Sequence, residues 1–592
     1  MVYRKWLCYS PVNGIWNVGA PGGKYIWKMG DAFVETRKYT RIRLEGTDLL
    51  NRLGVIYSQI VNDLLMKVDD GNGNYPRGFL HTSTTPLSTP NYYDQMWSRD
   101  VGRGIQELVE CGLIDDARSV AECVLGYDKS FGNHFGRVVN QDFGCYEVDG
   151  NVSLLMGVYR VWKYSGKNRG MGIRYLERCA EVFGWFEELA EESPYGGLLK
   201  SKSELSGNPD TDYFIFALFG TYGAMIAALA FREMADDCDD QERSLWLTGL
   251  ADRFKESLLQ WLLSRGSKGD QKTKTPTGVW LNGIDERTGL AAETGDFGPE
   301  FDISKWTRQL PFILDYDWAD GLWDEIRLAE VNRSSYEYIK REMCKGYFFR
   351  KYGFVSNTCF VGMGGRHDDT MAGYGQNYFT QAALLQGDVN VYTKCLDGIA
   401  RLAYDGDIVE PLTLDLNPWV MHECFTYENY ETGFDHTFGK NGVPEKCIMH
   451  NPGDEGNLVQ SAETVKTMSL VAGIFVKGNV LHVEPRLPWE CTRARVKDYP
   501  VVKNDGSVHR ISYVFCLDRW KNSYRLQVSG AADFEAVVFR IGPLPNVLCN
   551  ERELSGEWRI DRKYSACFAS KRVKHSGNDR LEVTLVNEIK IV

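Results

Sequence analysis

Apolar residues at helical spacing recur along most of this 592-residue chain. Leu49, Leu53, Ile56, Ile60 and Leu64 follow one another at i+3 or i+4, which is typical of the buried face of an α-helix. The same pattern predicts about twelve helices in all. Their expected ranges are 45–67, 97–112, 115–127, 150–165, 171–190, 212–236, 240–265, 303–314, 318–345, 370–387, 389–404 and 456–474.

These helices come mostly in adjacent pairs, with no apolar strand between the two members of a pair. This order favours six helical hairpins closed in a ring over βαβ units, in which strands and helices alternate. A superhelical array of repeats is the competing all-α arrangement. The chain shows no self-similarity at a fixed period, which such an array requires.

The segments before and after the helical region lack the helical spacing of apolar residues. Residues 1–44 are rich in glycine and aromatic residues and are expected to form strands and loops. After about residue 475, alternating runs such as Arg510–Phe515 predict an antiparallel sandwich. We therefore expect a β-rich segment at 1–44, a helical domain at 45–475 and a β-sandwich domain at 476–592.

Long connections separate many of the predicted helices. They are rich in Gly, Pro, Asn and acidic residues, and loops of this length inside a compact domain are usually functional. In a ring of helical hairpins, the loops that lead into the inner helices gather at one end. The long connections are 68–96, 128–149, 193–211, 266–302, 346–369 and 405–455.

Charge and cysteine usage limit the partners of the chain. The net charge is −12 and no basic block is present, so nucleic acid and anionic membranes are not expected to bind. No run of 18 apolar residues predicts a membrane span, and the start lacks the apolar core of a signal peptide. The 15 cysteines include no Cys-x-x-Cys pair, which favours reduced thiols in a cytoplasmic protein.

The stretch Trp97-Ser98-Arg99-Asp100 opens one of the predicted helices. It sets a flat apolar ring beside a fixed cation and a carboxylate, which suits the apolar face and the hydroxyl fringe of a sugar. The alternative is an ordinary helix start, with Asp100 at the positive end of the helix dipole and Arg99 in solvent.

This stretch resembles the W-x-R-D motif that starts the second barrel helix of glucoamylases and of bacterial amylo-α-1,6-glucosidase and trehalase relatives. The resemblance implies an inverting glycosidase with an (α/α)6 barrel, in which the Arg and the Asp hold hydroxyls of the sugar in the −1 subsite. It also agrees with a C-terminal β-domain. The predicted fold class is therefore mainly α: an (α/α)6 toroid with a C-terminal antiparallel β-sandwich and a short β-rich N-terminal segment.

Inverting hydrolysis needs a protonated carboxyl as general acid and an ionised one as general base, about 6.5–9.5 Å apart. If the glucoamylase plan holds, the acid comes from the loop before the sixth helix. Glu204 is the first candidate there, since it lies among small polar residues that a sugar can approach. Asp212 is the alternative acid, although an Asp at this point also suits a helix N-cap.

The general base is expected in the loop before the last helix of the barrel. Glu455 lies at the start of that helix, whose positive end keeps a carboxylate ionised. The glycines beside it let water and sugar come close. The alternative role for Glu455 is a simple helix cap, and Glu423 and then Glu410 are the next candidates for the base.

Further polar residues are candidates for binding sugar hydroxyls. Asp149 opens the fourth helix and resembles the acidic position that faces the −1 sugar in the superfamily. A glycine-rich polar stretch that enters a helix supplies the others, namely His367, Asp368, Asp369, Gln376 and Asn377. No metal is expected, because no second His lies at ligand spacing, and no organic cofactor is implied.

Together these residues predict an exo-acting inverting glycosidase on small oligosaccharides or glycan ends. One alternative on the same barrel is a disaccharide phosphorylase, which keeps the acid and replaces the base with a phosphate pocket. Another is a polysaccharide lyase, which needs Tyr and His. The last is a non-catalytic carbohydrate-binding protein. P-loop, Gly-x-Gly-x-x-Gly, Gly-x-Ser-x-Gly and His-Glu-x-x-His motifs are absent from the sequence.

Overall fold

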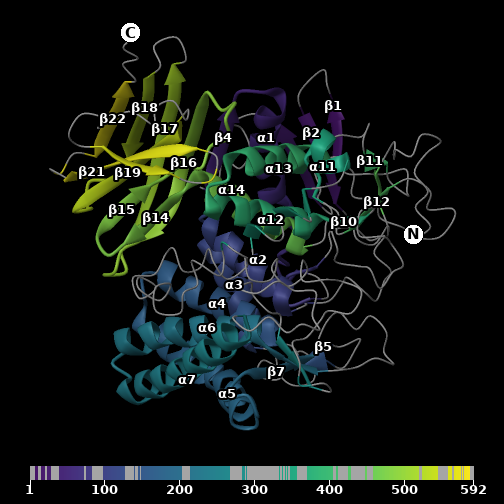
Figure 1. Cartoon of the computed structure of the whole chain (residues 1–592), viewed down its shortest axis with the longest axis vertical. Coiled ribbons are helices and arrows are strands. Elements are labelled where there is room, and N and C mark those ends of the chain that lie inside the picture. Colours follow the sequence, from purple (N-terminus) through teal and green to yellow (C-terminus); the bar gives the residue numbers. More distant parts are fainter. Residues whose placement is uncertain are drawn as a thin grey trace.

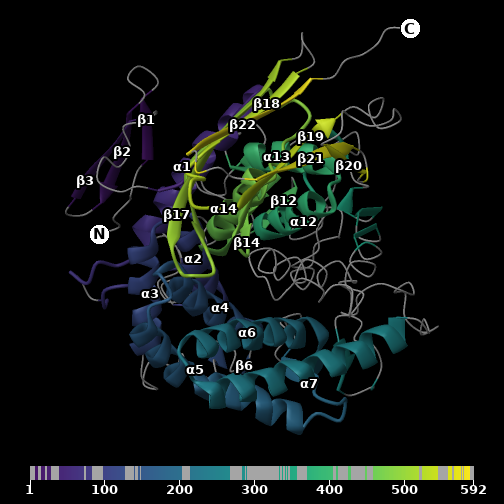
Figure 2. The same ribbon diagram turned by 90° about the vertical axis from the view of Figure 1, so that its left-hand side faces the viewer.

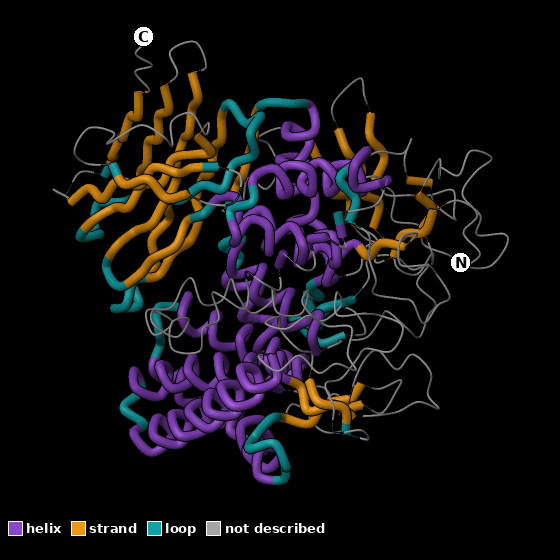
Figure 3. Tube along the Cα trace, in the orientation of Figure 1, coloured by secondary structure: helices purple, strands orange, loops and turns teal. Residues whose placement is uncertain are grey.

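In the computed structural model, helices occupy the middle of the chain and strands occupy both of its flanks (Figure 1). Figure 3 shows the same division by secondary structure, with helices in purple and strands in orange. The structure describes residues 7–10, 15–20, 23–28, 39–72, 75–82, 96, 98–126, 139–140, 145–146, 148–202, 214–266, 283–286, 289, 333, 336–337, 340–341, 343–344, 347–355, 370–403, 409–410, 424–427, 447–449, 458–518, 523–544, 558–562, 564, 566–574, 577 and 579–586.

Most of the predicted helices are present within the described residues. The first one shows why: Thr47 caps its N-terminus by accepting a hydrogen bond from the amide of Leu50, and Leu53, Ile56 and Ile60 are buried at helical spacing. The helices are α1 (Asp48–Lys67), α2 (Ser98–Glu110), α3 (Ile114–Gly126), α4 (Val148–Tyr164), α5 (Arg169–Glu191), α6 (Leu218–Asp237), α7 (Gln241–Gly266), α11 (Tyr347–Tyr352), α12 (Gly373–Gln386), α13 (Val389–Leu402) and α14 (Leu458–Ala472).

Two predicted helices begin later than expected. Residues 214–217 form strand β8 and residues 370–372 form strand β10, so α6 starts at Leu218 and α12 at Gly373. In both places pairing with distant strands overrides the local helical pattern. The short helix α11 falls in a stretch predicted as a loop.

Two other predicted helices lie wholly or largely outside the described residues. The predicted helix 303–314 lies outside the described residues. Of 318–345, the described positions are helical apart from a turn at Cys344.

The described helices form an inner and an outer layer. The inner series runs α12, α14, α2, α4, α6, and each of these helices packs against the next. Outside them, α13 and α1 cover α12 and α14, α3 covers α2 and α4, and α5 and α7 cover α6 (Figures 1 and 2). The inner helices are the second members of their hairpins, as the paired arrangement predicts.

Short strands precede several of the inner helices. Strand β6 comes before α4, β8 runs directly into α6, and β10 runs directly into α12. Stretches predicted as plain loops therefore contain small sheets. These sheets are formed by β5 (Val139–Asn140) and β6 (Cys145–Tyr146), by β7 (Leu199–Lys202), β8 (Phe214–Ala217) and β9 (Gly283–Asp285), and by β10 (Thr370–Ala372), β11 (Val409–Glu410), β12 (Cys424–Tyr427) and β13 (Cys447–Met449).

The C-terminal region forms two five-stranded sheets (Figure 1). One has the order β14-β15-β19-β21-β20 and the other β22-β18-β17-β16-β4. Pairing is antiparallel throughout except between β15 and β19, which are parallel and so depart from the predicted antiparallel pattern. The strands are β14 (Ile474–Lys477), β15 (Val480–Val483), β16 (Arg493–Val502), β17 (Val508–Asp518), β18 (Ser523–Ser529), β19 (Ala536–Leu544), β20 (Arg559–Arg562), β21 (Cys567–Lys574) and β22 (Arg580–Val586).

The N-terminal segment contributes to two sheets. Strands β1 (Leu7–Ser10), β2 (Ile15–Ala20) and β3 (Gly23–Lys28) form an antiparallel meander, as expected for a β-rich segment. Strand β4 (Arg41–Glu45) instead pairs with β16 at the edge of a C-terminal sheet. The division into three domains stays a prediction, but β4 ties the start of the helical region to the C-terminal sheets.

One cysteine departs from the expected chemistry. Cys567 in β21 is disulfide-bonded, whereas eight other described cysteines are free. The expectation of reduced thiols is therefore wrong for Cys567. Among the described helices, none combines the length and the apolar character that crossing a bilayer requires.

Strand β4 should be a major source of stability for the C-terminal sheet. Leu44 is buried in it, 2% exposed, whereas Arg43 points outward. We expect Leu44→Ala to lower the free energy of unfolding by about 2–5 kcal/mol, measured by denaturant titration. Arg43→Ala is the matched control, with an expected change within about 0.5 kcal/mol. Equal effects of the two variants would show that the β4–β16 pairing contributes little.

Candidate functional site

The N-terminal ends of neighbouring inner helices lie together. A Cβ added to Gly150 of α4 would come within 2.2 Å of Oγ of Ser98, the first residue of α2. A Cβ added to Gly220 of α6 would lie 3.3 Å from Cγ1 of Val148, the first residue of α4. Because α2, α4 and α6 therefore start at the same end, their positive dipole ends and the connections that enter them converge there.

Arg99 and Asp100 lie in the first turn of α2, at this end of the inner layer. Both side chains are half-buried. The carbonyl of Arg99 accepts a hydrogen bond from Oγ of Ser153 in α4 at 2.9 Å, which fixes the first turn of α2 against α4. The backbone that carries the Arg99 and Asp100 side chains is thus held against α4.

Asp149 lies in the first turn of α4, and only its backbone is described. The remaining predicted residues lie outside the described residues, but their places in the chain are informative. Glu204 and Asp212 fall in the connection between β7 and β8, and Glu455 comes three residues before α14. Trp97 directly precedes α2. The others outside are Glu423, His367, Asp368 and Asp369; Glu410 is described as the last residue of β11 in its backbone alone.

The side chains of Gln376 and Asn377, which were predicted to bind sugar hydroxyls, form hydrogen bonds within the protein. Gln376 is fully buried; its Oε1 accepts from the amide of Val355 and its Nε2 donates to the carbonyls of Gly353 and Cys395. Asn377 is also fully buried and bonds to hydroxyls of α14. The predicted sugar contacts of both residues are therefore wrong, because their amides already join α12 to its neighbours.

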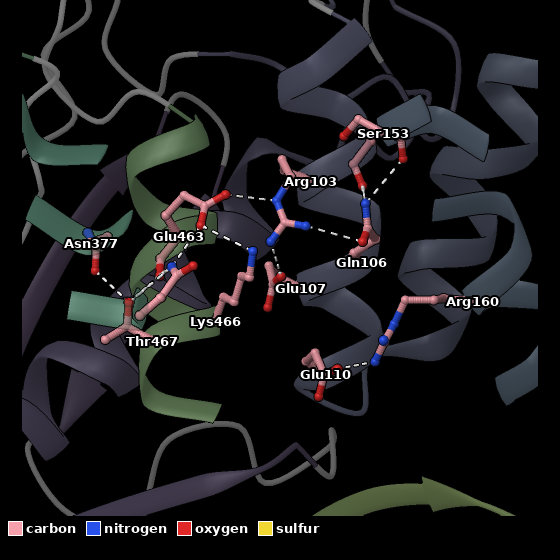
Figure 4. Close-up of polar contacts among 12 residues, drawn as sticks. Arg103, Gln106, Glu107, Glu110, Ser153, Arg160, Asn377, Glu463, Lys466 and Thr467 are labelled. Carbon is pink, nitrogen blue, oxygen red and sulfur yellow. Dashed lines mark hydrogen bonds and ion pairs between the residues drawn. The ribbon is translucent and has the colours of Figure 1, made fainter. Parts of the chain in front are cut away.

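A buried charge network joins α2 to α14 (Figure 4). Arg103, 2% exposed, donates from Nε to Oε1 of Glu463 at 2.8 Å and from NH2 to Oε1 of Glu107 at 2.7 Å. Its third bond goes to Oε1 of Gln106 at 3.2 Å. Nζ of Lys466 lies 3.8 Å from Oε2 of Glu463, so two cations face two carboxyl groups inside the helical layer.

The network continues into the two next inner helices. On one side Gln381 of α12 donates from Nε2 to Oε2 of Glu463 at 2.8 Å. On the other side Gln106 donates from Nε2 to the carbonyl of Ser153 in α4 at 3.1 Å. A continuous set of hydrogen bonds therefore runs through α12, α14, α2 and α4, just below their N-terminal ends.

Glu107 is the electrostatically unusual member of this network. Burial raises its pKa to about 8, because the loss of hydration outweighs the attraction of Arg103. The carboxylates of Glu110 and Glu463 shift the pKa in the same direction. Its Oε2 makes no hydrogen bond to any residue that the structure describes. Glu107 is thus a buried carboxyl that holds its proton at neutral pH.

Sequence reasoning missed this network. Every residue of α14 is buried, so its polar side chains as well as its apolar ones face other parts of the protein. The available signal was a helix with many polar residues, together with Arg103 between two glycines. Gly102 lets α4 approach, since an added Cβ would lie 2.3 Å from the backbone of Ser153.

The described residues contain no group of three or more His, Cys, Asp or Glu side chains arranged to hold a metal ion. The two cations of the α2–α14 network are Arg103 and Lys466, and both have carboxyl groups of the same network as partners. The chemistry available at this end of the helices is that of carboxyl, guanidinium and amide groups.

Comparison with solved structures identifies the fold. An α-L-rhamnosidase from Dictyoglumus thermophilum matches 96% of the chain with a TM-score of 0.50 and 9% sequence identity. The chain shares its fold with this rhamnosidase. The predicted resemblance to (α/α)6-barrel glycoside hydrolases is thereby confirmed. The chain covers 52% of the rhamnosidase, so it spans about half the length of that relative.

Two further structures match with lower scores. The α-L-rhamnosidase of Streptomyces avermitilis has a TM-score of 0.43 and 12% identity over 95% of this chain and 43% of its own. The glucoamylase of Saccharomycopsis fibuligera has a TM-score of 0.44 and 12% identity over 74% of this chain and 98% of its own. No protein-family model matches the sequence, and none of the curated proteins matches it.

Because the pKa of Glu107 is raised in the folded protein, its contribution to the free energy of unfolding depends on pH. The unfolded chain loses the Glu107 proton near pH 4.5 and the folded chain near pH 8, so the contribution of this group to stability falls as pH rises between these values. Glu107→Gln should remove that fall. Relative to the wild type, we expect the variant to gain about 1 kcal/mol per pH unit from about pH 5 to pH 8 in urea titrations. A constant loss at every pH would mean that Glu107 is ionised in the folded protein.

Proposed function

We propose that this chain is an exo-acting inverting glycoside hydrolase on oligosaccharides or non-reducing ends of glycans. The observation that carries the proposal is the convergence of the inner-helix N-termini, where Arg99 and Asp100 lie and where the connections with the candidate carboxylates enter. The fold shared with a protein named as an α-L-rhamnosidase supports the same class of reaction. In this proposal the helices close into an (α/α)6 barrel and the C-terminal sheets form a sandwich.

The proposed roles follow the chemistry of inversion. Glu204, protonated, donates to the leaving oxygen, and Glu455, ionised near the positive end of α14, removes a proton from the attacking water. Arg99 and Asp100 hold hydroxyls of the terminal sugar, and Trp97 supplies the apolar face. Asp149, His367, Asp368 and Asp369 complete the set that surrounds the sugar, with no metal or organic cofactor.

The substrate is proposed to be a small carbohydrate and not a nucleic acid or a membrane. A net charge of −12 repels polyanions, whereas a neutral sugar is bound by hydrogen bonds and ring stacking. The rhamnosidase likeness makes aryl α-L-rhamnosides the first substrates to try, followed by α-glucosides and disaccharides.

Replacement of either carboxylate should abolish most of the hydrolysis. We expect Glu204→Gln and Glu455→Gln to lower kcat by about 10²–10⁴-fold, because general acid and general base catalysis each contribute factors of this size. The measurement is the rate of hydrolysis of an aryl-glycoside and oligosaccharide panel, with the anomer of the first product followed by proton NMR. Wild type should release the inverted anomer. Glu181→Gln, on the exposed face of outer helix α5, is the control and should keep the wild-type rate.

Other outcomes would assign the function differently. Full activity in one variant would transfer its role to Asp212 or to Glu423. Turnover only after addition of phosphate would indicate a phosphorylase, and an ultraviolet-absorbing product would indicate a lyase. Sugar binding without turnover, unchanged in both variants, would indicate a carbohydrate-binding protein.

A further inference from the structure

The three hydrogen bonds of Arg103 connect α2 to α14 at one level along the two helix axes. Its guanidinium uses Nε for Glu463 on α14 and both terminal nitrogens for Gln106 and Glu107 on α2. Arg103 lies four residues after Arg99, about 6 Å along the axis of α2. Outside its own helix Arg103 forms an ion pair with Glu463, on the helix that follows Glu455 in the chain.

Directional bonds fix the register of helices more narrowly than apolar packing does. A planar guanidinium that donates to side chains on both helices tolerates little axial sliding of α14 past α2, since its donors form a rigid fork. The same network holds Gln381 on α12 and Ser153 on α4, and Ser153 in turn holds the carbonyl of Arg99. Four inner helices are therefore linked to one guanidinium, within the first three turns of each.

A second buried pair on α2 supplies an internal comparison. Glu110, at the C-terminal end of α2, pairs with Arg160 of α4 and accepts from the hydroxyl of Tyr499 in β16. Arg160 is 3% exposed, much like Arg103. Glu110 lies about 10 Å further along the axis of α2 than Arg103 does, so this second pair is at the end opposite to the proposed site. Both pairs stabilise the helices, but only the Arg103 pair lies next to the N-terminal turns.

We propose that Arg103 is a positioning residue of the site: through Glu463 and Gln106 it sets the axial register of α14 and α2, and so the placement of the general base and of the sugar-holding groups. This inference rests on the proposed glycosidase function. Arg103 itself is buried beneath the site and does not contact the substrate. A register error of about 1 Å is enough to lower a rate by about 10²-fold.

The test compares Arg103→Met with Arg160→Met, and Arg103→Lys with Arg160→Lys. Each Met variant leaves a buried carboxyl group without its arginine partner, so both should unfold at a lower denaturant concentration than the wild type. Only Arg103→Met is expected to lower kcat of the folded enzyme, by about 10–10²-fold, with KM changed less than threefold. Arg103→Lys restores the charge without the fork and should recover part of the rate. If the Met variants fail to fold, the two Lys variants make the same comparison.

Amide hydrogen exchange gives a readout independent of turnover. We expect faster exchange in α14, residues 458–472, and in the first half of α2 in the Arg103 variants, but not in the Arg160 variants. Equal kcat losses per folded molecule at the two arginines, or unchanged exchange in α14, would overturn the inference. Failure of the proposed function is seen separately, as an absence of sugar turnover by the wild type itself, and the exchange comparison decides the register role in that case too.

Discussion

Arg103 carries a full charge inside a layer of helices, and it is kept there by the carboxyl groups of Glu463 and Glu107. Removing one partner of such a buried pair costs about 3–5 kcal/mol, so neither α2 nor α14 can move independently of the other. Gln381 and Gln106 extend this constraint to α12 and α4. The arrangement of four inner helices therefore depends on one guanidinium, and the outer helices pack on that arrangement.

The polar interior also explains why the site is expected at the helix ends and not in the middle of the inner layer. The middle is filled by buried side chains, among them the charges and amides of the Arg103 network. The N-terminal ends present half-buried Arg99 and Asp100, and the long connections enter there. The inner helices are held rigidly by their polar contacts, whereas the long connections enter at their N-terminal ends. In such an arrangement the connections can change with the substrate while the helices stay the same.

Sequence reasoning succeeded where the signal was local. Helix α1 was predicted almost to its ends because its apolar spacing and its Thr47 cap lie within one segment. Strand β8 was taken for the start of a helix, since its pairing with β7 and β9 depends on residues far away in the chain. Gln376 was interpreted as a sugar contact because burial of a polar residue cannot be read from its neighbours. Arg103 was missed because its partner Glu463 is 360 residues away. The assignment of Glu204 and Glu455 stays a prediction.

Strand β4 has a consequence for the order in which the chain folds. Its Leu44 pairs with Ala494 of β16, 450 residues later, so during synthesis β4 leaves the ribosome long before its partner exists. Until then its backbone groups are an unpaired edge beside the first helix, available to other strands. The pairing with β16 then joins β4 to the completed C-terminal sheet. A strand that is synthesised late therefore stabilises a strand that is synthesised early.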